Sequence, residues 1–251
     1  MAAELAPDIL VLLAMAAFVA GFIDSIAGGG GLITVPALLL AGLAPVEALG
    51  TNKLQGVFGS ASATYAYARA GLVDLRHQLG PAVLSFLGAV AGAALATVLP
   101  GDWLRAALPV LLVVIALYFA FKPDMNDIDR ARRISPFLFG VAVVPPIGFY
   151  DGLFGPGTGS FFMLAFVALA GYGVLKATAH TKLLNFASNV GGLLFFLAAG
   201  AVMWKIGLMM GAAQFLGARL GARLAMKSGA RLIKPLLVAT CVVLAIRLLI
   251  D

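Results

Sequence analysis

Apolar stretches follow one another along almost the whole chain, and a single long hydrophilic segment separates them. This segment, 122–135 (KPDMNDIDRARRIS), divides the chain nearly in half. A helix needs about 20 apolar residues to cross the hydrocarbon core of a bilayer, and several stretches reach that length. The pattern therefore predicts an all-α, polytopic membrane protein. The apolar stretches are 9–23, 32–43, 46–68, 78–99, 104–121, 136–150, 160–171, 174–202, 206–226 and 235–250.

The composition excludes the other broad classes of protein. Hydrophobic residues make up 62% of the chain and charged residues only 11%, whereas a soluble domain carries about 25% charged residues on its wet surface. An apolar content this high also excludes intrinsic disorder. The net charge of +6 does not indicate nucleic acid, because the basic residues lie mainly between apolar stretches. We therefore expect membrane lipids as the surroundings and no nucleic-acid partner.

Short motifs recur in the same order in the two halves, which indicates an internal duplication. The spacing between equivalent motifs stays constant from the second pair to the third. We therefore predict a first transmembrane repeat over 1–125, a basic cytoplasmic link over 126–135 and a second transmembrane repeat over 136–251. The recurring pairs are 21–24 with 148–151, 53–54 with 182–183, and 86–89 with 215–218.

Lys and Arg residues are distributed oppositely in equivalent loops. The 227–234 loop region is rich in Arg and Lys, while the equivalent segment of the first half is nearly free of them. One loop earlier the bias is reversed: Arg69, Arg76 and His77 of the first half correspond to Ala198, Lys205 and Ile206 of the second. Because positive loops face the cytoplasm, equivalent loops should lie on opposite sides of the membrane. The two repeats are then inverted, with 122–135 and 227–234 in the cytoplasm. We expect both termini, Trp103 and Trp204 on the outer side of a bacterial cytoplasmic membrane.

Inversion requires an odd number of crossings in each repeat. Three full spans meet this requirement when the remaining glycine-rich pair of helices either enters and returns or crosses twice. The sequence therefore predicts about 8–10 membrane segments, with a re-entrant or discontinuous helix pair in each repeat.

Two glycine-rich breaks interrupt the apolar stretches at matching places, Gly28–Gly31 (GGGG) and Gly155–Gly159 (GPGTG). Irregular backbone at membrane depth is tolerated only against protein or a water-filled cavity. Helices that begin near Leu32 and Ser160 would direct their N–H groups and positive dipole ends into such a cavity. The alternative is that these glycines only allow close helix packing, as we expect for Gly88/Gly92, Gly207/Gly211 and Gly217/Gly221. Two matching breaks favour a binding site.

Ionisable residues accompany both breaks. Asp24 and Asp151 precede the breaks, and Lys53 and Lys182 lie inside the following stretches. Charges at this depth are costly and are typically functional or paired. In one interpretation a polar lining attracts an anion; in the other, each lysine neutralises an aspartate or extends outward, and so holds helices together. The candidate binding residues are Gly28, Gly29, Gly30, Gly31, Thr34, Asn52, Lys53, Gln55, Gly157, Thr158, Gly159, Ser160, Thr181, Lys182, Asn185 and Asn189; the candidate coupling or ion-pair residues are Asp24, Asp151 and His180.

Four segments resemble the TauE/SafE sulfite-exporter family, also called TSUP, and are most similar to its YfcA-like branch. The resemblance covers essentially the whole chain and implies a secondary transporter for sulfite, organosulfonates or other sulfur-containing anions. The second break, GPGTG, departs from the family's usual Gly-Gly-Gly run, which leaves the two half-sites unequal. The segments are 21–31 (GFIDSIAGGGG), 51–55 (TNKLQ), 148–152 (GFYDG) and 176–185 (KATAHTKLLN).

The sequence and the resemblance together predict a secondary transporter that moves a small anion by alternating access, with protons as a possible coupling ion. No nucleotide-binding Lys-Ser/Thr motif and no metal-ligand spacing is present, so we expect no enzyme activity, cofactor or metal. The alternatives are a cation or metal transporter that uses Asp24 and Asp151, a non-transporting membrane scaffold and, more remotely, an intramembrane enzyme. Substrate, direction and oligomeric state, including a homodimer, stay open.

Overall fold

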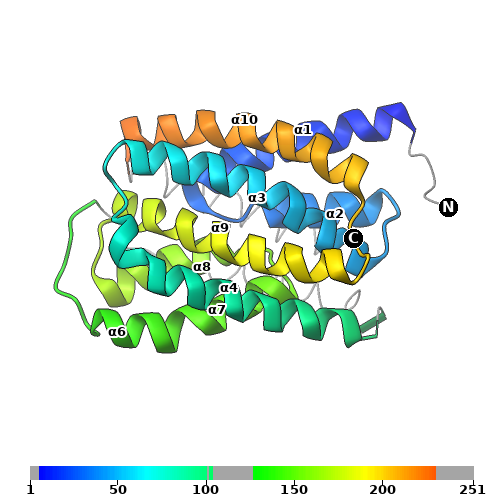
Figure 1. The fold of residues 1–251 in the computed structure, drawn as a ribbon. Helices are drawn as coiled ribbons and strands as arrows, with labels where there is room; N and C mark the ends of the chain where they lie inside the picture. Colours follow the sequence, from blue (N-terminus) through cyan, green and yellow to red (C-terminus); the bar gives the residue numbers. More distant parts are fainter. Residues whose placement is uncertain (1–5, 101, 104–126, 230–251) are drawn as a thin grey trace.

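A computed structural model describes residues 6–100, 102–103 and 127–229 (Figure 1). Every regular element in these residues is a helix, which confirms the predicted all-α class. The predicted stretches 104–121 and 235–250 lie outside the described residues. The elements are α1 (Pro7–Ala27), α2 (Gly31–Leu40), α3 (Pro45–Arg69), α4 (Leu75–Val98), α6 (Pro136–Leu138), the π-helical η1 (Phe139–Val143), α7 (Val144–Leu153), α8 (Thr158–Ala165), the π-helical η2 (Phe166–Ala170), α9 (Val174–Ala198) and α10 (Trp204–Ser228).

Several helices have the length and apolar character that a membrane span requires, which confirms a polytopic membrane protein. Among the described residues these are Pro7–Ala27, Leu75–Val98, Pro136–Leu153 and Val174–Ala198. Helices α3 and α10 have 25 residues each, but α3 buries many polar side chains and α10 carries basic residues toward its end.

The helix starts follow from local sequence. Pro7 and Pro45 occupy the first turns of α1 and α3, where the missing N–H of proline removes no helical hydrogen bond. Asp74 caps α4, since its Oδ1 accepts a hydrogen bond from the N–H of His77 at 3.2 Å and so satisfies one of the free donors of the first turn.

Four long helices form a layer in the order α10, α3, α9 and α4 (Figure 1). Helix α1 packs on α10, and α7 packs on α4. In Figure 1, α1 and α3 begin at the right while their equivalents α7 and α9 begin toward the left, so corresponding helices run in opposite directions. Inverted repeats would give this relation, and the division into two complete repeats stays a prediction.

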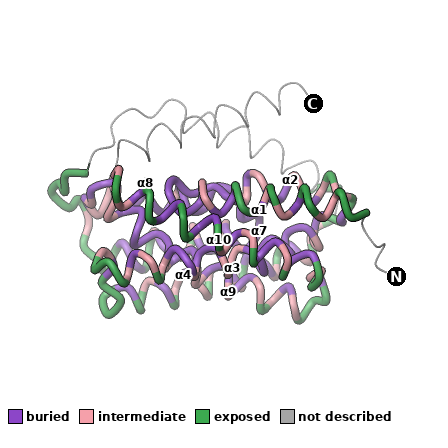
Figure 2. Tube along the Cα trace, turned by 90° about the horizontal axis from the view of Figure 1, so that it is seen from above, coloured by how far each residue is buried: buried purple, intermediate pink, exposed green. Residues whose placement is uncertain are grey.

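The pairs α1–α2 and α7–α8 lie on one face of this layer, and the buried residues run through the middle of the molecule (Figure 2). Within each pair the second helix runs back along the first, so the chain leaves the pair at the end of the molecule where it entered (Figure 1). This course is the one expected both for a pair that enters and returns and for a pair that crosses twice. It also brings both glycine-rich breaks to the interior.

Small residues let the helices of different halves approach closely. A Cβ atom at Gly92 of α4 would collide with the backbone of Phe149 in α7, and one at Gly217 of α10 would collide with the backbone of Phe18 in α1. The packing role predicted for these glycines is confirmed, because any side chain there would separate the helices. Gly88 and Gly221 approach backbone atoms of the neighbouring helix in the same way, whereas Gly207 and Gly211 give room to the side chains of Leu54 and Phe58.

Candidate functional site

The two glycine-rich breaks lie against each other at the centre of the molecule. A Cβ at Gly28 would lie 2.6 Å from the carbonyl carbon of Gly159. The hydroxyl of Ser160 donates to the carbonyl oxygen of Ala27 at 3.0 Å and so ties the second break to the first. The two predicted half-sites therefore adjoin each other.

The helices that follow the breaks begin at this contact. Helix α2 begins at Gly31 and α8 at Thr158, close to the predicted starts at Leu32 and Ser160. Gly157, before α8, has a φ of +82°, a left-handed conformation that favours glycine. In the part of the chain that the structure describes, the N–H groups of Gly31 and Gly159 donate to no carbonyl. Both helix N-termini thus present free donors and a positive dipole end.

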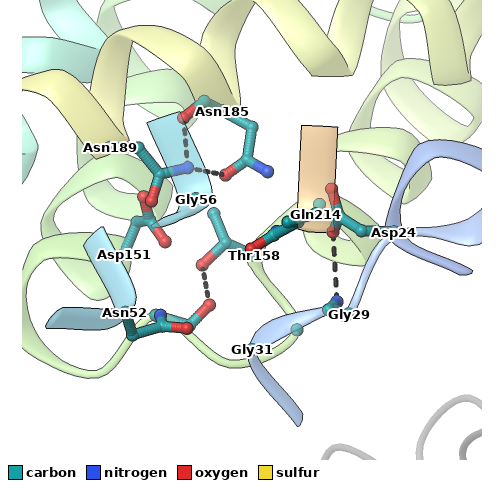
Figure 3. Close-up of a pocket in the computed structure, with 14 residues that line it drawn as sticks. Asp24, Gly29, Gly31, Asn52, Gly56, Asp151, Thr158, Asn185, Asn189 and Gln214 are labelled. Atoms are coloured by element: carbon teal, nitrogen blue, oxygen red, sulfur yellow. Dashed lines mark hydrogen bonds between the residues drawn. The ribbon is translucent and has the colours of Figure 1, made fainter. Parts of the chain in front are cut away.

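A small cavity separates the two helix starts (Figure 3). Its volume is about 20 Å³, which is room for about one water molecule. The lining comes from both halves of the chain, and most of the predicted binding residues are among it. The lining residues are Asp24, Gly29, Gly30, Gly31, Asn52, Gly56, Asp151, Gly155, Gly157, Thr158, Gly159, Asn185, Asn189 and Gln214.

Lys182 of α9 pairs with Asp24 of α1. Its Nζ lies 3.1 Å from Oδ2 of Asp24 and also donates to the backbone carbonyl of the same residue. The other carboxylate oxygen, Oδ1, accepts a hydrogen bond from the N–H of Gly30 at 3.1 Å. Because the Lys182 side chain is fully buried, this pair fixes the end of α1 to the middle of α9.

Lys53 of α3 pairs with Asp151 of α7. Its Nζ lies 2.9 Å from Oδ1 of Asp151, and the two side chains are 1% and 3% exposed. Each lysine therefore pairs with the aspartate of the other half, and the formal charges of the four residues cancel. Oδ2 of Asp151 has no hydrogen-bond partner within the described ranges. The pairing expected by the structural interpretation is present, and it leaves one carboxylate oxygen free beside the cavity.

Amide and hydroxyl groups complete the polar interior. Oδ1 of Asn52 accepts hydrogen bonds from the hydroxyl of Thr34 at 2.7 Å and from Nε2 of Gln55 at 2.9 Å. The Nδ2 of Asn189 donates to the backbone carbonyl of Asn185 at 2.7 Å (Figure 3). Some buried oxygens have no partner among the described residues, and such atoms are typical of sites that water or a ligand completes. These are Oε1 of Gln55, Oγ1 of Thr181 and Oε1 of Gln214.

Gln214 and Gly56 were not among the predicted site residues, and both line the cavity. Gln214 is a polar residue inside the apolar stretch 206–226, and its repeat equivalent is Ser85, which is also buried. A polar side chain at equivalent places in both halves is the signal that could have identified it. Gly56 gives room to Asn189, whose Oδ1 would lie 2.8 Å from a Cβ at that position.

The remaining candidates do not line the cavity. His180 lies apart from the aspartates: it lines a second cavity of about 740 Å³ beside the link, and its Nδ1 lies 3.0 Å from the carbonyl of Lys176. The others are buried around the central cavity, several of them in contact with residues of its wall. These are Gly28, Thr34, Lys53, Gln55, Ser160, Thr181 and Lys182.

Comparison with known proteins identifies the family. The family model described as "Sulfite exporter TauE/SafE" matches residues 13–248. The chain belongs to the TauE/SafE family. A "probable membrane transporter protein ORF9" from Sinorhizobium sp. is 64% identical over 99% of this chain and 95% of its own length. The "probable membrane transporter protein YfcA" of Escherichia coli K12 is 48% identical over 98% and 91%, and a "probable membrane transporter protein" of Haemophilus influenzae is 45% identical over 97% and 96%.

These relatives of the TauE/SafE family carry transporter names, and the helices are those of a multi-pass membrane protein. The protein is accordingly a membrane transporter of this family. No solved structure matches the chain.

Proposed function

We propose that this TauE/SafE protein is a secondary transporter that carries a small anion, a sulfur oxyanion or an organosulfonate, across the bacterial cytoplasmic membrane. The observation that carries the proposal is the convergence of two helix N-termini on one buried cavity, where the N–H groups of Gly31 and Gly159 have no carbonyl acceptor within the described residues. Such N-termini bind anions through their N–H groups and dipoles. The family description supplies the sulfur-anion class.

The anion preference comes from donors and dipoles, because the formal charges around the cavity cancel. Lys53 and Lys182 are neutralised by their aspartates, so neither lysine is a free counter-charge. Protonation of Asp151 or Asp24 would release the paired lysine, which could then face an entering anion. Binding of the proton together with the anion would couple transport to protons.

The central cavity is too small for the proposed substrate in the conformation described. It has room for about one water molecule, whereas an oxyanion of sulfur has several heavy atoms. The helices around it must therefore move apart to admit the anion, as alternating access requires.

Flux through purified protein in proteoliposomes tests the proposal. Sulfite, sulfate and an organosulfonate are offered in turn, with a pH-sensitive dye inside the vesicles. Wild-type protein should move at least one of these anions with an accompanying proton signal. The double variant Lys53→Met/Asp151→Asn preserves the charge balance and should fold but lose flux. If none of the anions moves, or if the double variant transports like wild type, the proposal is wrong.

A cation transporter is the second candidate, and the free acceptor atoms favour it. Oδ2 of Asp151, Oε1 of Gln55 and Oε1 of Gln214 are buried without hydrogen-bond partners among the described residues, and oxygen acceptors are the ligands of hard cations. Charge reversal distinguishes the two candidates. Lys53→Glu should abolish the flux of an anion but preserve or increase the flux of a cation.

A further inference from the structure

The cavity of about 740 Å³ lies at the end of the molecule where the link packs. Its polar lining comes from the start of α4, the link and the start of α9: Asp74, His77, Gln78, Arg132, Tyr172 and His180. Asp74 pairs with His77 at 2.6 Å, whereas Arg132 has no ion pair within the described ranges. The wall therefore carries the carboxylate of Asp74, partnered by His77, and the guanidinium of Arg132, which has no ion-pair partner among the described residues.

A buried polar group faces this cavity without a partner. Gln78 is 7% exposed, and its Oε1 has no hydrogen-bond partner in the described part of the chain. A buried polar atom without a partner costs free energy, and the cavity beside it is large enough for many water molecules. A hydrated ligand in the cavity would complete the hydrogen bonds of Gln78.

The large cavity and the central cavity are neighbours along two helices. On α9, His180 lines the large cavity and Asn185 the central one, a separation of about 7–8 Å of helix rise. On α8 and its π-helical continuation η2, Thr158 lines the central cavity and Phe166 the large one. Phe162 lies between them in sequence and is completely buried, so packed side chains close the passage in this conformation.

The equivalent positions at the other end of the molecule are packed shut. By the spacing of the repeated motifs, Pro81, His77 and Gly140 of the large cavity correspond to Met210, Ile206 and Leu13. These last three are 0%, 6% and 3% exposed and form one apolar cluster with Leu43, which is 7% exposed. The two ends of a chain with equivalent halves are therefore in different states, one open and one closed.

We propose that the large cavity is the open vestibule of the transport path, which receives the hydrated anion, and that the cluster of Leu13, Leu43, Ile206 and Met210 is the closed gate at the opposite end. This inference rests on the proposed transport function. When the transporter changes state, the cluster opens and the vestibule closes. Arg132 attracts the anion, and water of its hydration shell donates to Oε1 of Gln78 before the anion passes Phe162.

Thiol labelling of two equivalent positions tests the vestibule. The single cysteine of the chain, Cys241, is replaced by alanine, and either Pro81→Cys or Met210→Cys is added. A membrane-impermeant maleimide is applied from each side of oriented vesicles. Pro81→Cys should react at least about tenfold faster than Met210→Cys, since a buried thiol reacts only when the structure opens locally. The two positions should react from opposite sides.

Addition of the anion found in the flux assay should slow the labelling of Pro81→Cys and, during turnover, speed the labelling of Met210→Cys. Equal labelling of both positions, or labelling from the same side, overturns the vestibule even if the anion is transported. Absence of flux for every anion overturns the transport function, and the vestibule with it.

A Gln78→Leu variant should melt at the wild-type temperature but raise the KM for the anion several-fold. An unchanged KM would remove Gln78 from the binding step.

Discussion

At the scale of single residues, the buried lysines are the positions where one substitution should matter most. Lys182→Met leaves the carboxylate of Asp24, which is 8% exposed, without its cation. Breaking a buried ion pair by removal of one partner destabilises a protein by about 3–5 kcal/mol. We expect the variant to lose about this much unfolding free energy, measured by denaturant unfolding in detergent.

The matched double variant separates stability from function. Lys182→Met/Asp24→Asn removes both charges, so most of the lost stability should return while transport stays absent. If the double variant is as unstable as the single one, the ion pair is not the source of the effect.

The residues of the site were predictable from the sequence to the extent that chemistry and repetition marked them. Asp24, Asp151 and both lysines stand out because a charge inside an apolar stretch or directly at its end is rare and is repeated in each half. Their crosswise pairing was not predictable, because it depends on how the halves pack. His180 was predicted as a site residue because it lies close to Lys182 in the sequence. Residues two positions apart on a helix point to different faces, so the side chain of His180 lines the cavity of about 740 Å³ instead.

At the scale of elements, the first glycine-rich break should tolerate no side chain. Gly28 has a φ of +81°, and a Cβ there would collide with the backbone of the second break. Gly71 is the matched control: its φ is +73°, but no atom lies within 4 Å of a Cβ. Gly71→Ala should cost only the left-handed strain of about 1–2 kcal/mol, while Gly28→Ala should cost more and abolish transport. Thermal unfolding and flux of both variants check this, and equal losses would contradict it.

The start of α9 is fixed by a carboxylate of the link and should respond to acid. Oδ1 of Asp129 accepts from the N–H of Gly173 at 2.7 Å, and Oδ2 accepts from Lys176 at 2.8 Å. The Gly173 hydrogen bond, followed by Lys176, lowers the pKa of Asp129 below its ordinary value. A lowered pKa means that the stabilisation is present above the ordinary aspartate pKa of about 3.9 and is lost as the pH falls through the lower folded-state value.

Hydrogen exchange of the Gly173 amide measures this cap. Protection should persist at neutral pH in the wild type and disappear in acid, whereas Asp129→Asn should show weak protection already at neutral pH. The start of α3, which Glu47 caps through the N–H of Ala44, is the internal reference for the comparison of the two proteins at neutral pH. Equal protection of Gly173 in both proteins at neutral pH would show that Asp129 does not hold the start of α9.

Helix positions followed closely from the apolar pattern, and irregular turns did not. The predicted stretch 46–68 became α3 over Pro45–Arg69, and 78–99 became α4 over Leu75–Val98. The π-helical segments η1 and η2 were not predicted, because a π-turn changes the hydrogen-bond register without a clear change in apolar pattern. Both contribute to the wall of the large cavity, so their role was visible only in three dimensions.

At the scale of the whole molecule, the opposite charge bias of the two halves predicts an inverted orientation that a topology experiment can test. The link packs at the start of α9, where the N–H of Arg130 donates to Gly171 at 2.7 Å, and the exposed Gly200 follows the other end of this helix of 25 residues. A helix of this length is about 37 Å long, so Ala131 and Gly200 should lie on opposite sides of the membrane. The basic residues of the link place Ala131 in the cytoplasm by the positive-inside rule.

Reporter domains inserted into the full chain after Ala131 or Gly200 measure this orientation. A fluorescent protein that matures only in the cytoplasm should be bright after Ala131 and dark after Gly200, and alkaline phosphatase, which is active only outside, should show the reverse. Each site receives both reporters in separate variants, and this is the matched control. A site that is dark with one reporter but active with the other is correctly folded, so the signal reports the side of the membrane. Both sites on one side would contradict α9 as a span. If Ala131 lies outside and Gly200 in the cytoplasm, α9 is still a span, but the charge argument is wrong. The vestibule would then face the exterior.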